Sequence, residues 1–388
     1  MKDSALRKIP LFSRWFTMGR VAIAMIFHDK VKSIGTLLGV IFAVLLSNQQ
    51  AGIFLGLLTK NTMFVDNAKA DIWIAPRGAE TLQAGPQISI DLLYRARVTP
   101  GIRSAQPLIY TGAPVALPSG GTHAVTLAGS VGPDRLGGPW NIVASSESVL
   151  NRQDTMIFED SERGKLGGIN LGSVREVSGH RVVVGGFSWG LEPFGPTFAF
   201  ADYDTARLLA RVDNRHTHFV LCTVNQGEDP ERLAAELQRQ MPEARVLTKR
   251  GFHNAIIGEL LKGSIGLTFG TSTMFGLLIG FVIVSLSMFS SVLDNIREFG
   301  TLKAIGATIV DLARVMFVQA VLFSAAGTLI GLTLVTRIGE AMRSPKLALV
   351  LPWQLILGTT VVMQVLCIVA SVMALWRIRK IEPGMVFR

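Results

Sequence analysis

The sequence predicts an α-helical membrane protein with four transmembrane helices plus a large mixed α+β extracytoplasmic domain between helices 1 and 2. One observation is composition: of the 388 residues, 49% are hydrophobic and only 17% are charged, whereas soluble domains carry about 25% charged residues. The second is that four segments are long and apolar enough to cross a bilayer, which takes about 20 mostly apolar residues. The predicted spans cover residues 33–58, 263–292, 312–336 and 353–376.

The distribution of charge predicts the orientation of these spans. The net charge is +10, yet residues 59–262 are balanced between acidic and basic groups, so the excess of Lys and Arg flanks the spans. Short basic flanks stay in the cytoplasm. We therefore expect an inner (plasma) membrane protein that crosses the membrane several times, with both termini (residues 1–32 and 377–388) and the loop 293–311 in the cytoplasm. This charge pattern does not favour nucleic acid as a partner.

The remaining connections follow from that orientation. Residues 59–262 and the loop 337–352 are expected on the outer, periplasmic side. The loop 337–352 contains Arg337, Arg343 and Lys346 and fits the charge rule poorly, but the even number of spans between two cytoplasmic ends forces it outward.

The segment before the first span is predicted to be an amphipathic helix in the membrane interface. Its apolar side chains recur at helical spacing, with Arg14, Arg20 and Asp29 among the polar positions. The alternative is an ordinary solvated flank. The apolar stretch that follows is too long for a signal peptide and has no A-x-A-like cleavage site, which favours a membrane anchor.

Residues 59–262 read as a folded α+β domain with short strands separated by Gly- and Pro-rich turns. Strands are predicted over 71–75, 123–128, 155–158, 181–184, 198–200, 218–224 and 244–247. The clearest helix starts at Asp229-Pro230-Glu231, an N-cap followed by proline at the first helical position, and runs to Met241. Together with its flanking strands it forms a strand-helix-strand unit.

From Phe252 the sequence predicts a helix that continues into the second span as a stalk. Phe252, Ile256 and Leu260 lie on one apolar stripe. Such a helix would act as a stiff lever between the outer domain and the membrane. The alternative is a simple linker, because Gly258, Gly263 and Gly266 lower helix propensity in this segment.

Motifs for catalysis or metal binding are missing from the sequence. It has no phosphate-binding loop, no G-x-S-x-G or H-E-x-x-H motif, and only Cys222 and Cys367 as cysteines. His216 and His218 lack carboxylate or Cys partners at metal-like spacing and are predicted to be ordinary surface histidines. The chain is therefore expected to be neither an enzyme nor a metal or cofactor protein by itself.

Small residues recur at four-residue spacing in the spans and predict close helix packing. The pairs expected to lie in helix contacts are Gly266 and Gly270, Gly276 and Gly280, and Gly327 and Gly331. They favour a tightly packed, oligomeric bundle. Few ionisable residues lie inside the spans, which argues against an ion-driven carrier, and polar residues such as Asn48, Gln319 and Gln364 are better explained by hydrogen bonds between helices.

The cytoplasmic loop after the second span resembles a known family. Residues 294–308 read DNIREFGTLKAIGAT, which is similar to the R-E-[IF]-G-x-L-[KR]-A-[IL]-G-A-[ST] loop of the FtsX/MacB-type permeases of ABC transporters. The tail 379–388 resembles the closing element of the same family, although Met385, Val386 and Phe387 depart from it. One span, a large outer domain and then three spans is also the topology of the family.

Further cues resemble the DevC sub-family, the permease of an exporter with a separate ATPase and a periplasmic adaptor. These cues are the run 182–187 followed by Gly190 and Phe194, and the segment 71–74 soon after the first span. Lipoprotein-releasing LolC/LolE permeases share the topology and are an alternative. A second alternative is an FtsX-like transmitter that regulates a cell-wall hydrolase.

The resemblance implies a function and partners. It implies that the loop docks on a cytoplasmic ABC ATPase, which holds ATP and Mg, through Arg297, Glu298, Phe299, Gly300, Leu302, Lys303, Ala304 and Gly306. It implies a homodimer that couples ATP hydrolysis to motion of the outer domain through the stalk. The expected outcome is efflux of a lipid, glycolipid, drug or peptide, with membrane lipid, a periplasmic adaptor and an outer-membrane duct as further partners.

Overall fold

The computed structural model of the chain describes residues 11–28, 30–82, 86–132, 134–191, 195–294, 300, 307–341 and 349–379. Its contacts divide the chain into two compact units. The helical unit contains the described residues up to Leu55 and from Leu267 onward, and the α/β domain contains the described residues of 56–266.

The helical unit is built from long apolar helices. Its helices are α1 (Leu11–His28), α2 (Lys30–Asn67), α7 (Ser264–Asp294), α9 (Ile309–Ala341) and α10 (Trp353–Arg379). Of these, α2, α7, α9 and α10 are long and apolar enough to cross a membrane, in agreement with the predicted number of spans. Both α2 and α7 continue past the boundary of the helical unit, and α2 ends inside the α/β domain.

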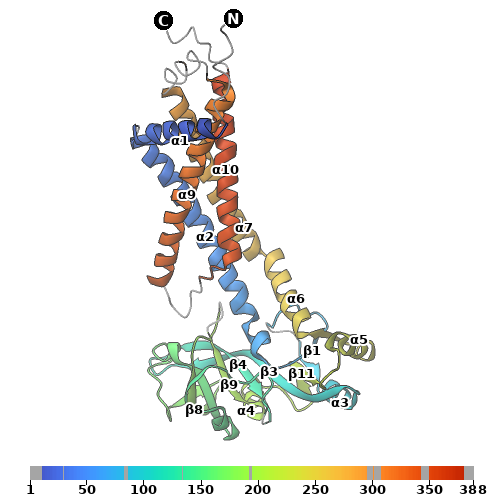
Figure 1. Cartoon of the computed structure of the whole chain (residues 1–388). Helices are drawn as coiled ribbons and strands as arrows, with labels where there is room; N and C mark the ends of the chain where they lie inside the picture. The colour runs from blue at the N-terminus through green and yellow to red at the C-terminus, as the bar shows by residue number, and fades with distance from the viewer. Residues whose placement is uncertain are drawn as a thin grey trace, which may run out of the picture. The chain divides into compact units, whose positions relative to one another are not determined.

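The first helix differs in direction from the other four. Figure 1 shows α1 lying crosswise to the long helices at one end of the bundle. Met25 and Ile26 of α1 pack against the bundle core, and Ser33 of α2 donates a hydrogen bond to the Ile26 carbonyl (2.7 Å). This crosswise orientation is the one that an interfacial helix needs.

The α/β domain contains a ten-stranded sheet and a two-stranded sheet. The strands of the large sheet are β1 (Ile72–Pro76), β3 (Ile102–Ala116), β4 (Thr122–Ser130), β5 (Ile142–Ala144), β6 (Thr155–Glu159), β7 (Val174–Val177), β8 (His180–Ser188), β9 (Phe198–Asp202), β11 (Phe219–Val224) and β12 (Ala244–Thr248). Their order is β12-β1-β11-β3-β4-β9-β6-β8-β5, and β7 pairs with β3 and β8. The small sheet pairs β2 (Ile88–Ser89) with β10 (His216–Thr217).

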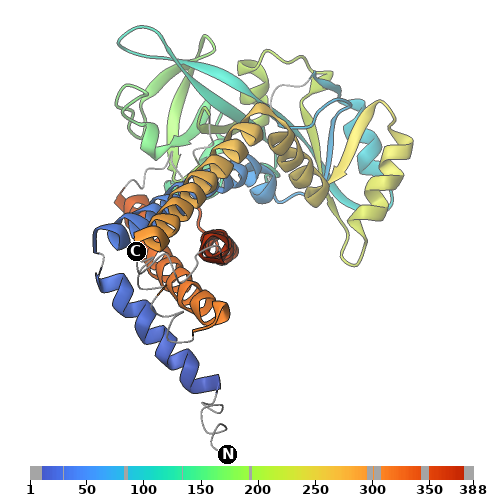
Figure 2. The ribbon, with the colours of Figure 1, turned by 90° about the horizontal axis from the view of Figure 1, so that it is seen from above.

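The long strand β3 joins two halves of this domain (Figure 2). Its first part, up to Leu108, pairs with β11, and its second part, from Ile109, pairs with β4. All seven strands predicted from the sequence are present, whereas β3 was not predicted. Pro107 and Pro114 lie inside β3, and because proline is rare within sheet strands, the sequence pattern gave no sign of the longest strand.

Four α-helices cover the sheet or extend from it. They are α3 (Asp91–Val98), α4 (Tyr203–Leu209), α5 (Pro230–Gln240) and α6 (Lys249–Lys262). The predicted cap of α5 is present, because the Asp229 side chain accepts a hydrogen bond from the Glu231 amide. Leu233, Ala234 and Leu237 of α5 share a buried core with residues of β1, β11 and α3, so the predicted apolar face of α5 is the buried one.

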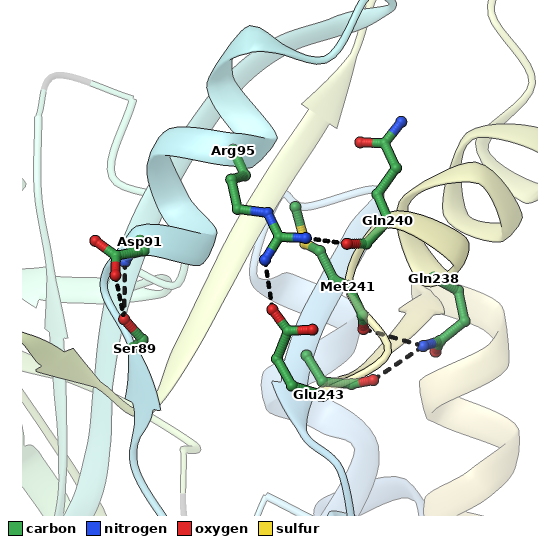
Figure 3. Close-up of polar contacts among 8 residues, drawn as sticks. Ser89, Asp91, Arg95, Gln238, Gln240, Met241 and Glu243 are labelled. Atoms are coloured by element: carbon green, nitrogen blue, oxygen red, sulfur yellow. Dashed lines mark hydrogen bonds and ion pairs between the residues drawn. The ribbon is translucent and has the colours of Figure 1, made fainter.

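The free edge of β12 is closed by a side chain of α5. Gln238 accepts a hydrogen bond from the Val246 amide (2.8 Å) and donates to the Ala244 carbonyl (2.9 Å), so its carboxamide pairs with the strand as a neighbouring backbone would. Figure 3 shows Gln238 beside the turn, where its side chain also donates to the Met241 carbonyl. In the same view Arg95 of α3 pairs with Glu243 and donates to the Gln240 carbonyl. These contacts tie the turn between α5 and β12 to α3, and an edge strand with satisfied backbone groups is a poor template for unwanted pairing.

Candidate functional site

The predicted ATPase-docking loop lies between α7 and α9. Of its candidate residues, Gly300 is described; it is helical and buried. The others, namely Arg297, Glu298, Phe299, Leu302, Lys303, Ala304 and Gly306, lie outside the described residues. The docking role of the loop therefore stays a prediction.

The end of this loop is held by a reciprocal cap at the start of α9. The Thr308 amide and hydroxyl both donate to one carboxylate oxygen of Asp311 (3.1 and 2.7 Å), and the Asp311 amide donates to the Thr308 hydroxyl (3.3 Å). Arg314 adds an ion pair to the other oxygen of Asp311 (3.0 Å). This arrangement is a capping box, in which two residues satisfy each other's backbone donors at a helix start.

The sequence contains a local signal for this cap. The last residue of the family motif is Thr308, and Asp311 follows three positions later, which is the [ST]-x-x-[DE] pattern of a capping box. Asp311 is 4% exposed. A buried carboxylate at a helix N-terminus is stabilised by the cap and by the helix dipole, so Thr308 and Asp311 fix the point at which the loop becomes a helix.

Four of the glycines with predicted packing roles lie against α2. A Cβ on Gly280 would lie 2.1 Å from the Cβ of Ala43, and one on Gly276 would lie 3.3 Å from the Ser47 hydroxyl. On the other side, Cβ atoms on Gly327 and Gly331 of α9 would lie 2.5 and 2.9 Å from side-chain atoms of Val40 and Val44. These glycines let α7 and α9 approach α2 within one chain, so close packing inside the monomer accounts for them without an oligomer.

The other pair of glycines behaves differently. A Cβ on Gly270 would meet nothing within 4 Å. A Cβ on Gly266 would meet the backbone carbonyls of Leu260 and Leu261 at 2.6 and 2.4 Å. Gly266 is therefore required by the close turn between α6 and α7, and its predicted partner Gly270 has open space beside it.

Between α2 and α10 a polar contact lies inside the bundle. Asn48 is fully buried; it donates to the Val44 carbonyl (2.8 Å) and accepts from the Thr359 hydroxyl (3.3 Å). This contact supports the interpretation of polar residues in the spans as interhelical hydrogen bonds, which satisfy groups that could not find water in a bilayer.

The predicted stalk residues are part of the domain core. Phe252 and Ile256 are 0% and 2% exposed, and the partly buried Leu260 packs against the same cluster. Their stripe faces an aromatic cluster, defined here as Phe64, Trp73, Tyr110, Trp140, Phe198, Phe200, Phe219 and Phe252. The helix α6 is thus attached along its length to the α/β domain.

The end of α2 reaches the same cluster. Phe64 lies 4.9 Å from Tyr110, 5.4 Å from Phe198 and 6.3 Å from Trp73, measured between ring centroids. Contacts of this kind between aromatic rings add about 0.5–1.5 kcal/mol each to the burial of their surface. The two helices that leave the α/β domain, α2 and α6, are therefore both anchored in one buried aromatic cluster.

The prediction of one continuous helix from Phe252 into the second span is wrong. The helix α6 ends at Lys262, and α7 begins at Ser264. Gly263 between them has extended backbone angles (φ −72°, ψ 172°), and its amide bonds the Glu259 carbonyl. Of the glycines that supported the linker alternative, Gly263 lies at the break and Gly266 allows the close backbone approach of the turn, whereas Gly258 lies inside α6.

The two histidines near β10 are not equivalent. His216 is partly exposed, with 42% of its side chain accessible, and it contacts Asp213 (2.7 Å), as a surface histidine would. His218 is 8% exposed, and burial lowers its pKa to about 4. The prediction of a surface position is therefore wrong for His218. Among the described residues, no three His, Cys, Asp or Glu side chains form a group that could hold a metal ion.

A buried carboxylate that sequence reasoning missed organises the loop after β8. Glu159, at the end of β6, is 1% exposed and accepts hydrogen bonds from the amides of Gly190 (2.8 Å) and Leu191 (3.1 Å). The Gly190 carbonyl in turn accepts from Lys60 of α2 (2.9 Å). Nothing in the sequence around Glu159 marks it, because its partners are backbone amides about 30 residues away.

The part of the helical unit that contains α7, α9 and α10 matches a family model. Residues 270–383 match the family model described as FtsX-like permease C-terminal. This segment is therefore similar to FtsX-like permease domains, and the resemblance drawn from the loop 294–308 is confirmed at that level. Assignment to the DevC sub-family stays a prediction.

A curated relative and two solved structures are also similar to the chain. An uncharacterised ABC transporter permease of Methanocaldococcus jannaschii is 25% identical over 162 residues, which are 37% of this chain and 39% of that protein. The periplasmic region of MacB from Actinobacillus actinomycetemcomitans aligns with a TM-score of 0.34 and 9% identity, over 52% of this chain and 99% of that structure. The extracellular domain of the transporter YknZ from Gram-positive bacteria aligns with a TM-score of 0.31 and 14% identity, over 46% and 98%.

Proposed function

We propose that this chain is the permease subunit of an ABC transporter and that a separate cytoplasmic ATPase hydrolyses ATP. The observation that carries this proposal is the match of residues 270–383 to the FtsX-like permease domain, because that segment contains the loop 294–308, which resembles the docking loop of the family. In this proposal the loop docks on the ATPase, and ATP and Mg bind to the partner. The chain itself is not an enzyme.

The packing of the α/β domain supports a route for the coupling. Because α2 and α6 are both anchored in the aromatic cluster, a displacement of either helix would move the sheet with it and would not be absorbed by a flexible linker. The loop between α7 and α9 is fixed at its far end by Thr308 and Asp311. We propose that movement imposed on this loop by the ATPase passes along these helices to the α/β domain.

The remaining parts of the proposal concern assembly and cargo. The chain would act as a homodimer with two ATPase subunits in the inner membrane, with both termini in the cytoplasm and the α/β domain outside. It would drive efflux of a lipid, glycolipid, drug or peptide through a periplasmic adaptor and an outer-membrane duct. This assembly follows the resemblance to exporters of the same family, a fold-level analogy.

The test is to purify the tagged chain from its own membranes in mild detergent and to identify the proteins that come with it. We expect an ABC ATPase whose ATP hydrolysis rises when the permease is present, together with an adaptor. Recovery of a cell-wall hydrolase or a lipoprotein chaperone in place of the adaptor would replace the exporter by one of the two alternatives. Recovery of no ATPase would refute the proposal.

A pair of variants locates the docking site in the same complex. Glu298→Arg and Gly300→Trp should abolish coupled ATP hydrolysis and leave membrane insertion unchanged. The matched control is Glu228→Arg, a charge reversal at an exposed turn of the α/β domain, which should keep wild-type activity. Full activity of both loop variants would show that the ATPase docks elsewhere.

A further inference from the structure

The helix α2 sets a depth scale for the residues packed beside it. It is one continuous helix from Lys30 to Asn67, and residues 33–59 contain no charged side chain. At 1.5 Å per residue this stretch is about 40 Å long, which equals the bilayer with its headgroup regions. Lys32 and Lys60 are the first charged residues at its two ends, so Lys60 lies at the level of the lipid headgroups.

Lys60 is bonded to a loop of the α/β domain. Its ammonium donates to the Gly190 carbonyl (2.9 Å), which places that loop at the depth of Lys60. The loop follows β8 and is held by the buried carboxylate of Glu159, which accepts from the Gly190 and Leu191 amides and from the Ser188 hydroxyl. The position of the loop beside α2 is thus fixed by several bonds on both of its sides.

A second, independent link leads to the same depth. The Trp189 amide donates to the Asn141 carbonyl (3.0 Å). The residue before Asn141 is Trp140, whose ring packs edge-on against Phe64 of α2 (centroids 5.9 Å apart). Phe64 lies one helical turn beyond Lys60, a rise of about 6 Å. Both links therefore connect the loop of Trp189 to residues 60–64 of α2, at the headgroup level and just beyond it.

The side chain of Trp189 is not buried in the core. Its side chain is 48% exposed, whereas its neighbours Ser188 and Leu191 are fully buried. Tryptophan is enriched at membrane–water interfaces because its ring is amphipathic: the apolar body enters the acyl boundary and the indole N–H meets the headgroups. An indole exposed to water at this position contributes no stabilisation, whereas the same indole is stabilised when a lipid surface lies at that depth.

We propose that Trp189 inserts into the headgroup region of the leaflet on the side of the α/β domain, so that the loop 188–191 is a lipid-contacting surface of this domain. The partner is the phospholipid surface itself. Lys60 and Glu159 are positioning residues that hold the loop at the required depth. The α/β domain would then contact the membrane at a point other than the helices that connect it.

The test measures the depth of position 189 in the full chain reconstituted into phosphatidylcholine vesicles. Trp189→Cys is labelled with an environment-sensitive fluorophore, and quenching by nitroxides on the lipid headgroup or in mid-chain is compared with quenching by iodide in water. Cys222 and Cys367 are both buried, so the label goes to the introduced cysteine. Two exposed valines provide control positions, and the control variants are Val361→Cys in α10 and Val174→Cys in β7.

The expected result is strong quenching of the label at position 189 by headgroup nitroxide and at most half the iodide quenching seen at position 174. Val174 pairs with Val183, which precedes Trp189 by six residues, about 20 Å in extended chain. If only the loop 188–191 contacts lipid, the exposed position 174 should report water. The label at position 361 should respond to mid-chain nitroxide. Equal iodide quenching at 189 and 174 would overturn the proposal, as would headgroup quenching at 174 equal to that at 189.

The label at position 361 tests the membrane-spanning arrangement separately. If no lipid nitroxide quenched it, that arrangement would be refuted as well as the proposal. Normal mid-chain quenching at 361 would confine a failure to the lipid contact of Trp189.

Discussion

Phe252 of α6 packs edge-on against the indole of Trp73 in β1, with ring centroids 5.2 Å apart. Both side chains are fully buried, and Phe219 contacts each of them. The contact joins the helix that leads toward α7 to β1, the strand next to the edge strand β12. It is a stiff connection, since packed interiors deform little, and the transmission of motion proposed above requires such a connection.

Phe252→Ala should destabilise the α/β domain by about 3–5 kcal/mol, the usual cost of truncating a buried Phe. The measurement is denaturant unfolding of the full chain in detergent, followed by tryptophan fluorescence. Leu261→Ala in the same helix is the control, because Leu261 is 53% exposed and its loss should cost well under about 1 kcal/mol. Equal effects of the two variants would contradict the anchoring of α6 through Phe252.

Gly280→Ala should destabilise the helical unit, because the new methyl group would overlap the Cβ of Ala43. Overpacking of this kind costs about 1–3 kcal/mol. Adding Ala43→Gly to the same chain removes the overlap and should restore part of the loss. The midpoint of thermal unfolding in detergent measures both effects.

The control for this pair is Gly270→Ala, the same substitution in the same helix at a position with open space. It should leave the midpoint unchanged or raise it slightly, since alanine favours helix over glycine. If Gly270→Ala proved as harmful as Gly280→Ala, close packing against α2 would not be the reason for glycine at position 280.

Thr308→Ala should weaken the start of α9 by about 1 kcal/mol, the usual cost of losing a helix cap. In the ATPase complex proposed above, it should also reduce coupled ATP hydrolysis, because the far end of the docking loop would lose its fixed point. Thr308→Ser keeps the hydroxyl that bonds Asp311 and should retain coupling. A Ser variant as impaired as the Ala variant would assign the loss to the methyl group and not to the cap.

His218 should make the stability of the α/β domain depend on pH. Burial lowers its pKa to about 4, whereas the same residue in the unfolded chain has a pKa of about 6.5. Between these values the unfolded state binds the proton and the folded state does not. The contribution is therefore fully present above about pH 6.5 and is lost progressively as the pH falls toward 4, up to about 3 kcal/mol.

The measurement for His218 is the unfolding midpoint in denaturant at pH 7.5 and pH 5.0, for the wild-type chain and for His218→Phe. Other groups also titrate in this range, so the difference between the two chains is the quantity to compare. His218→Phe should show the smaller loss between the two pH values, and the exposed-site control His180→Phe should behave as wild type. An identical pH dependence in all three chains would show that His218 does not carry the effect.

Local patterns in the sequence were enough for the number of long apolar helices, for the capped helix α5 and for the strands that have regular apolar runs. These features depend on composition and on the spacing of residues close together along the chain. The strand β3 escaped prediction because Pro107 and Pro114 interrupt its pattern, and only pairing with β11 and β4 shows that the segment is one strand. The break at Gly263 escaped because helix propensity alone does not reveal where two helices must turn against each other.

What the sequence by itself determined was the class of architecture and the family loop, since hydropathy and a short motif are both read along the chain. What only the tertiary structure decided was which residues meet: Gly280 with Ala43, Phe252 with Trp73, Glu159 with the amides of the loop after β8, and that loop with Lys60. Each of these contacts joins residues far apart in the chain, so no local pattern encodes it. Their geometry follows from close packing of the folded interior, where the position of every side chain depends on all of its neighbours.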